Sequence, residues 1–208
     1  PNSRDAHEFY GLFLATVRED WENALFHMNQ ALGVDPLNLM LRANLASTLW
    51  QAGRKDGAFA EIQGLLDLAP NFATAYYYQG LFYLEVKMYE KAIEELEKAQ
   101  SLMGESPMLR GRLGLALALA GKKEEARSIL GELKELSKTR YISSYYIALI
   151  HAGLNENDQA FGYLDKANEE NARELIEIGG EAGLAPLRAD PRFADLLIKI
   201  GLRQNDGP

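Results

Sequence analysis

One spacing constrains this chain of 208 residues more than any other feature, because small residues recur every 34 positions. The series is Ala24, Ala58, Ala92, Ala126 and Ala160. Four residues after each alanine stands Met28, Ile62, Leu96, Leu130 or Leu164, and three further on stands Ala31, Leu65, Ala99, Leu133 or Ala167. A fixed period of this length is typical of stacked supersecondary units rather than of one globular core. It predicts a surface that holds another molecule, without naming that molecule.

Within each unit the apolar pattern predicts two amphipathic helices joined by a short turn. In the second unit the first helix ends at Gly53, a left-handed cap, and the second ends at Pro70. Later turns are expected at Gly121-Lys122 and around Asn155. Loops this short force neighbouring helices to be antiparallel. We expect units at about 4–38, 39–72, 73–106, 107–140 and 141–172, capping helices at 173–202, and a tail at 203–208.

Small residues explain why the period is strict. Ala46, Gly80, Gly114 and Ala148 fall on first helices, and the alanine series falls on second helices. Helix axes that cross at small side chains approach to about 8 Å, the lower end of the usual range. A bulkier residue there would push the helices apart and disturb the stacking.

Composition excludes several classes of protein. The net charge is −8 and no Lys/Arg cluster exceeds the pair Lys122-Lys123, so direct binding of nucleic acid is not expected. There is no cysteine, which excludes disulfides and thiolate metal sites. The longest apolar run, 113–120, is far shorter than the roughly 20 residues that cross a bilayer, so no membrane contact is expected within this stretch.

Residues that carry catalysis or bind metal are not evident. His7, His27 and His151 are expected to lie apart, without a histidine or carboxylate partner at metal-ligand spacing. His151 takes an aromatic core position of the fifth unit, which favours a packed histidine over a ligand. Acidic pairs such as Glu94-Glu95 are expected on outer faces, where burial does not shift their pKa values. We therefore predict no enzyme, no catalytic residue, no metal and no cofactor.

The C-terminal region has the pattern of a terminal cap. Asp190 is a suitable N-cap, Pro191 fits the first helical position, and Gly201 ends the helix. The last helix of a stack needs one polar face, which Arg192, Asp195 and Lys199 would supply.

The chain resembles a tetratricopeptide repeat array over about residues 4–172. The third unit carries the family pattern at Tyr76, Gly80, Tyr83, Tyr89, Ala92, Leu96 and Ala99, and Pro36 and Pro70 close the first two units. The chain departs from the pattern at Gln79, Gly104 and Lys138, and by one extra residue before Trp21. The resemblance implies an all-α, right-handed α-α superhelix, a solenoid of five hairpins whose concave face is lined mainly by first helices.

A narrower resemblance concerns the last third of the chain. The stretches 135–141, 147–150, 158–161 and 186–193 are similar to the end of a bacterial subgroup in which repeats follow a winged-helix domain, a Ser/Thr kinase or a nucleotide cyclase. It implies the partner-sensing part of a bacterial signalling protein. Ala185 replaces the aspartate that is usual before Pro-Leu-Arg. Because the sequence starts at Pro1 without methionine, we interpret the chain as a piece of a longer protein. We expect it in the cytoplasm unless a preceding segment places it elsewhere.

The family register gives the candidate partner-binding residues of the concave face. They are Glu8, Leu12, Asn44, Ser47, Trp50, Gln51, Tyr77, Tyr78, Leu81, Glu85, Arg112, Leu115, Tyr145, Tyr146 and Leu149. Trp50, Tyr77 and Tyr78 would form an aromatic patch that anchors a partner. The alternative is that some of these aromatic rings pack between neighbouring units.

One subtype of the family grips a C-terminal carboxylate with lysine, asparagine and arginine at fixed inward positions. The matching positions here hold Glu8, Leu12, Asn44, Thr74 and Tyr78, of which only Asn44 fits. We therefore expect an extended or helical peptide, or a folded protein, bound chiefly by apolar contact. A small-molecule sensor and a self-association module are the alternatives, and the oligomeric state is open.

Overall fold

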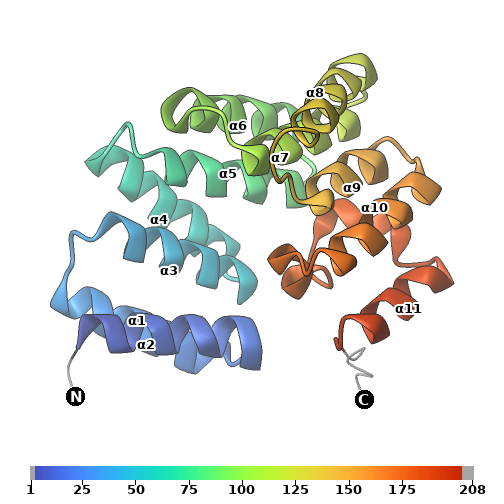
Figure 1. Ribbon diagram of the computed structural model, residues 1–208. Helices are drawn as coiled ribbons and strands as arrows, with labels where there is room; N and C mark the ends of the chain where they lie inside the picture. Colours follow the sequence, from blue (N-terminus) through green and yellow to red (C-terminus); the bar gives the residue numbers. More distant parts are fainter. Residues whose placement is uncertain (1–2, 203–208) are drawn as a thin grey trace. The chain divides into compact units, whose positions relative to one another are not determined.

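The computed structural model describes residues 3–202, apart from the side chain of residue 177, and all regular secondary structure within that range is helical. The α-helices are α1 (Arg4–Phe13), α2 (Trp21–Val34), α3 (Leu39–Gln51), α4 (Lys55–Leu68), α5 (Ala73–Glu85), α6 (Tyr89–Met103), α7 (Pro107–Leu119), α8 (Lys123–Leu136), α9 (Ser144–Gly153), α10 (Asn157–Glu169) and α11 (Pro191–Lys199). A π-helix, η1 (Leu14–Arg18), follows α1, and two 3₁₀ helices, η2 (Arg173–Glu177) and η3 (Ala182–Leu187), precede α11 (Figure 1). The predicted all-α class of paired helices is confirmed. The expected tail, 203–208, lies outside the described residues.

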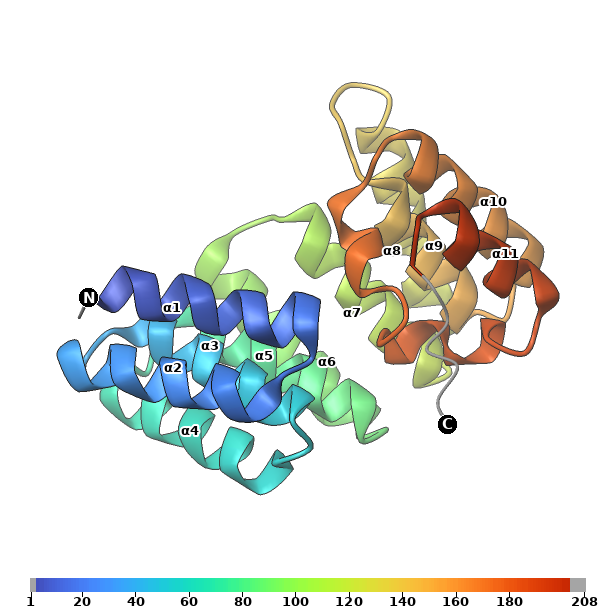
Figure 2. The same cartoon turned by 90° about the horizontal axis from the view of Figure 1, so that it is seen from below.

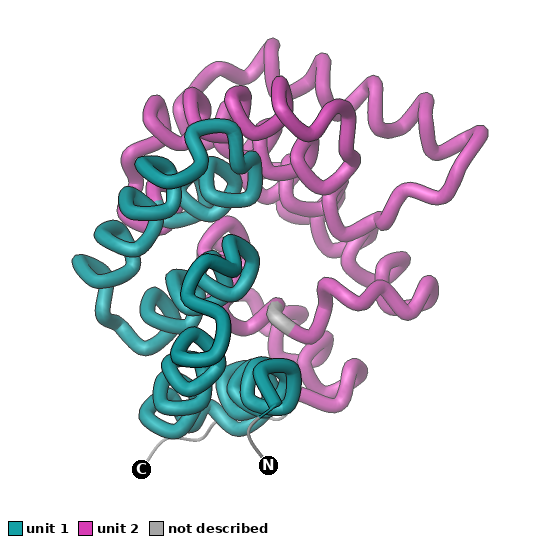
Figure 3. The backbone as a smooth tube through the Cα atoms, turned by 90° about the vertical axis from the view of Figure 1, so that its left-hand side faces the viewer, with its two compact units in different colours: residues 1–82 teal, residues 83–208 magenta. Residues whose placement is uncertain are grey.

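The chain forms two compact units that divide within α5, residues 1–82 and residues 83–208 (Figure 3). In unit 1 the helices α1 to α4 lie side by side (Figure 2). Their seam is made by buried side chains of α2 and α3, namely Leu25, Met28, Ala31, Leu41 and Leu45. In unit 2 the helix α9 contacts α7, α8 and α10, and all ten of its residues are buried.

The alanine series lies at the centre of the helix contacts. Ala24, Ala58, Ala92, Ala126 and Ala160 are fully buried. The glycines of α7 are equally constrained. A Cβ at Gly114 would lie 2.5 Å from Ile150 Cδ1, and one at Gly111 would lie 2.6 Å from Tyr146 Cβ. Close approach of α7 and α9 therefore depends on residues without side chains, as the period predicts.

The turns follow the predicted caps. Gly53 and Gly121 adopt φ values of 74° and 81°, and Asn155 adopts 61°. Only glycine, and less readily asparagine, adopts this left-handed region at low cost, so these residues end the first helices and reverse the chain. At the C-terminus Asp190 accepts a hydrogen bond from the Arg192 N–H at 3.0 Å, and Pro191 occupies the first turn as expected.

The extra residue of the first unit has a structural counterpart. Residues 14–18 form a π-helical turn, and the Asp20 N–H donates to the Leu14 carbonyl at 3.1 Å. Glu19 then takes a left-handed conformation, with φ 51°. A single π-turn accommodates one inserted residue without shifting the helix face, so Leu14 and Ala15 still pack on Ala24.

The region 173–202 differs from the expected capping helices. Only α11 is a regular α-helix, and 173–187 folds into two short 3₁₀ helices because Gly179-Gly180 and Pro186 interrupt the α pattern. The expected polar residues of α11 are exposed, but two of them bridge back to α10. Arg192 pairs with Asp158 at 2.8 Å, and Lys199 pairs with Asp165 at 3.0 Å.

Candidate partner-binding face

The candidate residues of unit 1 line α1, α3 and α5. Asn44 Nδ2 on α3 donates to Glu8 Oε1 on α1 at 3.1 Å, and both side chains are half-buried. Leu12 packs against the α2–α3 seam. Ser47 is half-buried and Gln51 is exposed. These residues give the first helices of unit 1 a mixed polar and apolar surface.

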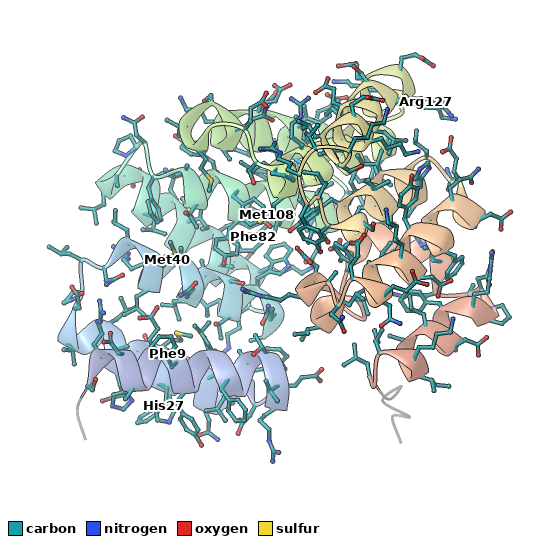
Figure 4. All side chains as sticks on the ribbon, in the orientation of Figure 1. Phe9, His27, Met40, Phe82, Met108 and Arg127 are labelled. Carbon is teal, nitrogen blue, oxygen red and sulfur yellow. The ribbon has the colours of Figure 1, made fainter. Side chains whose placement is uncertain are left out.

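Trp50 does not present its ring to a partner. Its residue exposure is 6%, and the indole stacks on Phe82, which Figure 4 labels, with centroids 4.2 Å apart and planes 4° apart. Phe59 meets the same indole edge-on at 5.6 Å, and Lys55 Nζ lies 4.9 Å from its centroid. The prediction of Trp50 as an anchor is therefore corrected, because α3, α4 and α5 enclose the ring and make it a packing residue.

Two aromatic candidates of α5 keep part of their surface. Tyr77 and Tyr78 are half-buried, with ring centroids 5.6 Å apart, and Leu81 beside them is also half-buried. Tyr78 packs further against Phe82 at 6.3 Å. Glu85, at the end of the helix, is exposed. Tyr77, Tyr78 and Leu81 are the apolar part of the unit 1 face.

In unit 2 the corresponding first-helix face is covered. Leu115 and Tyr145 are each 1% exposed, and Tyr146 and Leu149 are also buried. The cover is the stretch 172–187, hereafter the covering segment, which lies against α7 and α9. A Cβ at Gly183 would collide with Leu115 Cδ2. These four side chains are therefore not on an open surface as expected, because the chain itself covers them in the described structure.

A buried ion pair fixes the covering segment. The carboxylate of Glu181 binds the Arg112 guanidinium on α7, and their side chains are 10% and 12% exposed. The Tyr145 hydroxyl donates to Glu181 Oε2 at 3.1 Å, and the Gly183 N–H donates to Oε1 at 3.0 Å. Burial would raise the pKa of Glu181, but the charge and hydrogen bond of Arg112 hold that pKa below its ordinary value. Glu181 is therefore ionised, and Arg112 is committed to an internal partner.

A second carboxylate anchors the beginning of the covering segment. Tyr146 donates to Glu174 Oε1 at 2.8 Å, and the Ser143 hydroxyl donates to Oε2 at 3.2 Å. The sequence-based prediction missed Glu174 and Glu181 because isolated acids in an irregular stretch look like solvated charge. The side chains that bind them, Arg112, Tyr145, Tyr146 and Ser143, are all far away in the sequence.

The histidines are placed in two different ways. The prediction for His151 is confirmed, since it is buried and its Nδ1 lies 2.7 Å from Glu156 Oε2. The expectation that His7 and His27 lie apart is wrong. Their Nδ1 atoms are 2.8 Å apart, because α1 and α2 pack as one hairpin. Among residues 3–202 no cluster of three potential ligands is arranged to hold a metal ion.

Surface pockets lie away from the candidate face. One is between α10 and α11, next to Phe161, Arg192 and Lys199, and another is between α6 and α7, next to Gln100 and Arg110. Both cations of the first pocket are paired with carboxylates, Arg192 with Asp158 and Lys199 with Asp165. None of the helices in the described part of the chain is both long and apolar enough to span a membrane.

Comparison with known proteins identifies the kind of fold. A family model of the tetratricopeptide repeat matches residues 73–102. The thermophilic TPR protein TTC0263 of Thermus thermophilus superposes with a TM-score of 0.67 at 21% identity, over 88% of this chain and 99% of that one. PilF of Pseudomonas aeruginosa superposes with a TM-score of 0.61 at 22% identity, over 95% of this chain and 90% of that one. These matches support a tetratricopeptide repeat array, as the sequence resemblance implies.

One curated relative is a much longer protein than this chain. The DnaJ homolog subfamily C member 7 homolog of Dictyostelium discoideum is 26% identical over 171 residues. The match covers 79% of this chain but 31% of that protein, so this chain spans about a third of its relative.

Proposed function

We propose that this chain is a protein- or peptide-binding module whose binding surface is the first-helix face of unit 1. One observation carries the proposal. Tyr77, Tyr78 and Leu81 on α5 stay half-buried, as do Asn44 and Ser47 on α3, whereas the equivalent face of unit 2 is covered. Partly exposed tyrosines on one first helix, with amide and hydroxyl groups on another, suit a peptide that offers apolar side chains.

The biological setting is part of the same proposal. The resemblance of 135–141 and 186–193 to a bacterial signalling subgroup supports a regulatory module attached to an output domain. Binding would then act on that domain only if the ligand prefers one conformation of the repeats. A chaperone-tail receptor is not proposed, because Asn44 is the only match to a carboxylate clamp.

The experiment is a selection of peptides from a random library on the full chain, followed by titration of the selected peptides. Tyr77→Ala should weaken binding by about tenfold or more, because an aromatic anchor is lost. The matched control is Tyr10→Ala, which removes a 50% exposed tyrosine outside the face and should change affinity less than about twofold. Equal affinities for the two variants would exclude the unit 1 face.

A second candidate, self-association, is favoured by the first hairpin. Phe9, Phe13, Val17 and Phe26 are large apolar residues that are 46–70% exposed on α1, η1 and α2. An apolar set of this kind often marks an interface. Sedimentation at rising concentration tests it. A concentration-dependent mass that disappears in Phe9→Ser would support a dimer through this hairpin, and a monomer throughout would exclude it.

A further inference from the structure

The covering segment has a regularity that differs from the helical period of the rest of the chain. Every third residue from 172 to 187 turns inward: Ala172, Leu175, Ile178, Leu184 and Leu187 are buried, and the Glu181 side chain is 10% exposed. A 3₁₀ helix has three residues per turn, so this spacing places the buried side chains in one row along the segment. Its η3 part contacts α9, and Gly183 lies against Leu115 of α7.

Five members of the buried row are apolar, and one is a carboxylate. Glu181 meets a complementary donor set, the Arg112 guanidinium and the Tyr145 hydroxyl. Glu174, outside the row, meets the Tyr146 and Ser143 hydroxyls. The covering segment thus has a particular chemistry: a central carboxylate with buried apolar side chains three and six residues to either side, and a second carboxylate seven residues before the first.

The helices at the two ends of the covering segment contact each other independently of it. α11 is held on α10 by the Arg192–Asp158 and Lys199–Asp165 ion pairs, and the Arg192 guanidinium lies 4.2 Å from the Phe161 ring centroid. Neither contact involves the covering segment. The segment has only short 3₁₀ helices of its own, with Gly179-Gly180 between them. Its order therefore depends mainly on the face that it covers.

We propose that the α7–α9 face is a binding site for an acidic, apolar peptide segment, and that residues 172–187 fill this site in cis and are displaced by such a partner. The inference extends the proposed function, peptide binding by first helices, to a second face with its own residues. A cis segment tethered at both ends has a high effective concentration, so a partner must bind strongly or the cis segment must be weakened.

The test uses the full chain and a fluorescent peptide that copies residues 171–188. A chain with Glu181→Gln keeps the shape of the side chain but loses the ion pair, which weakens the cis contact. This variant should bind the peptide at least about tenfold tighter than the unchanged chain. The matched control is Glu169→Gln, which neutralises an exposed acid of α10 and should bind as the unchanged chain does. A peptide that itself carries Glu181→Gln should bind poorly to every chain.

Two results would overturn the proposal in this assay. In the first, the acidic peptide binds the Glu181→Gln and Glu169→Gln chains with equal affinity. In the second, the peptide that carries Glu181→Gln binds as tightly as the acidic peptide. Tyr77→Ala should leave this affinity unchanged, so failure here is distinguishable from failure of the unit 1 proposal.

Hydrogen exchange on the unchanged chain decides the matter if Glu181→Gln does not fold. Amides of 173–187 should exchange faster than those of α9, and an excess of unlabelled peptide should accelerate 173–187 but not α11. Exchange of 173–187 at the rate of α9, unaffected by peptide, would instead identify a permanent cap and end the proposal.

Discussion

Arg112 on α7 and Glu181 between η2 and η3 form a buried ion pair although 69 positions separate them in the sequence. The pair holds the covering segment on the first-helix face of unit 2. The first-helix face of unit 1 keeps half-buried tyrosines. Since neither group is more than 12% exposed, the energy of the contact depends strongly on whether both partners are present.

Glu181→Ala should destabilise the docked state of 172–187 by about 3 kcal/mol, because Arg112 is left buried without its carboxylate. The double variant Arg112→Met, Glu181→Leu should lose much less, since well-packed apolar groups replace a buried pair at little cost. Hydrogen exchange of residues 173–187, together with denaturant unfolding of the whole chain, measures the loss in each variant. Additive losses in the double variant would show that the two side chains do not interact.

Gly114→Ala should cost about 1–3 kcal/mol of unfolding free energy, because its Cβ would stand 2.5 Å from Ile150 Cδ1. The control is Gly131→Ala on α8, where a Cβ meets nothing within 4 Å. That change should stabilise the protein by about 0.5–1 kcal/mol through helix propensity. The urea concentration at the unfolding midpoint should fall for Gly114→Ala and rise for Gly131→Ala. A shift in the same direction for both variants would contradict the close contact of α7 and α9.

Ala92→Leu should cost about 1–3 kcal/mol by overpacking a fully buried position of α6. Glu94→Leu on the same helix introduces the same side chain at an exposed position and should stay within about 0.5 kcal/mol. Thermal unfolding compares the two. Similar melting temperatures would show that the small size of the periodic alanines is not what keeps the stacking strict.

Trp50→Ala should destabilise unit 1 by about 3–5 kcal/mol, because the indole is buried between Phe59 and Phe82. Trp50→Phe should cost far less, since stacking on Phe82 is kept and a buried Nε1 without a hydrogen-bond partner in the described structure is removed. Unfolding monitored by circular dichroism, which does not depend on the fluorescence of Trp50, measures the difference in stability. If Trp50→Ala left stability intact but abolished peptide binding, the indole would be a binding residue after all.

Acid should weaken the fold through His151. Burial lowers the pKa of His151, and the positive charge of Lys134 lowers it further, although the hydrogen bond to Glu156 acts in the opposite direction. The unfolded chain therefore binds this proton at higher pH than the folded chain, so stability is complete above about pH 6.5 and falls as the pH decreases below it.

The variant that tests this is His151→Phe, which keeps an aromatic ring on Tyr163, 5.3 Å away in the present stack. Its unfolding free energy should change less between pH 7 and pH 5 than that of the unchanged chain. A steeper loss in the variant would reverse the assigned sign.

The sequence alone determined the repeating architecture of this protein. The alanine period, the cap at Gly53 and the small residue Gly114 all act through neighbours within one or two helices, and helical periodicity records such contacts directly. The period also assigns residues to first helices, which is why Arg112, Tyr145 and Tyr77 were all candidates for one kind of surface.

Tertiary structure decided which of these positions a partner can reach. Trp50 and Phe82 stack across α3 and α5, His7 meets His27 within one hairpin, and Glu181 docks on Arg112, and none of these pairs follows from a local pattern. The period of three in 172–187 was present in the sequence, but a 3₁₀ segment gains its order from the surface on which it packs. Long-range packing therefore closed one face and left the other partly exposed, because burial is a property of the folded chain and not of any single helix.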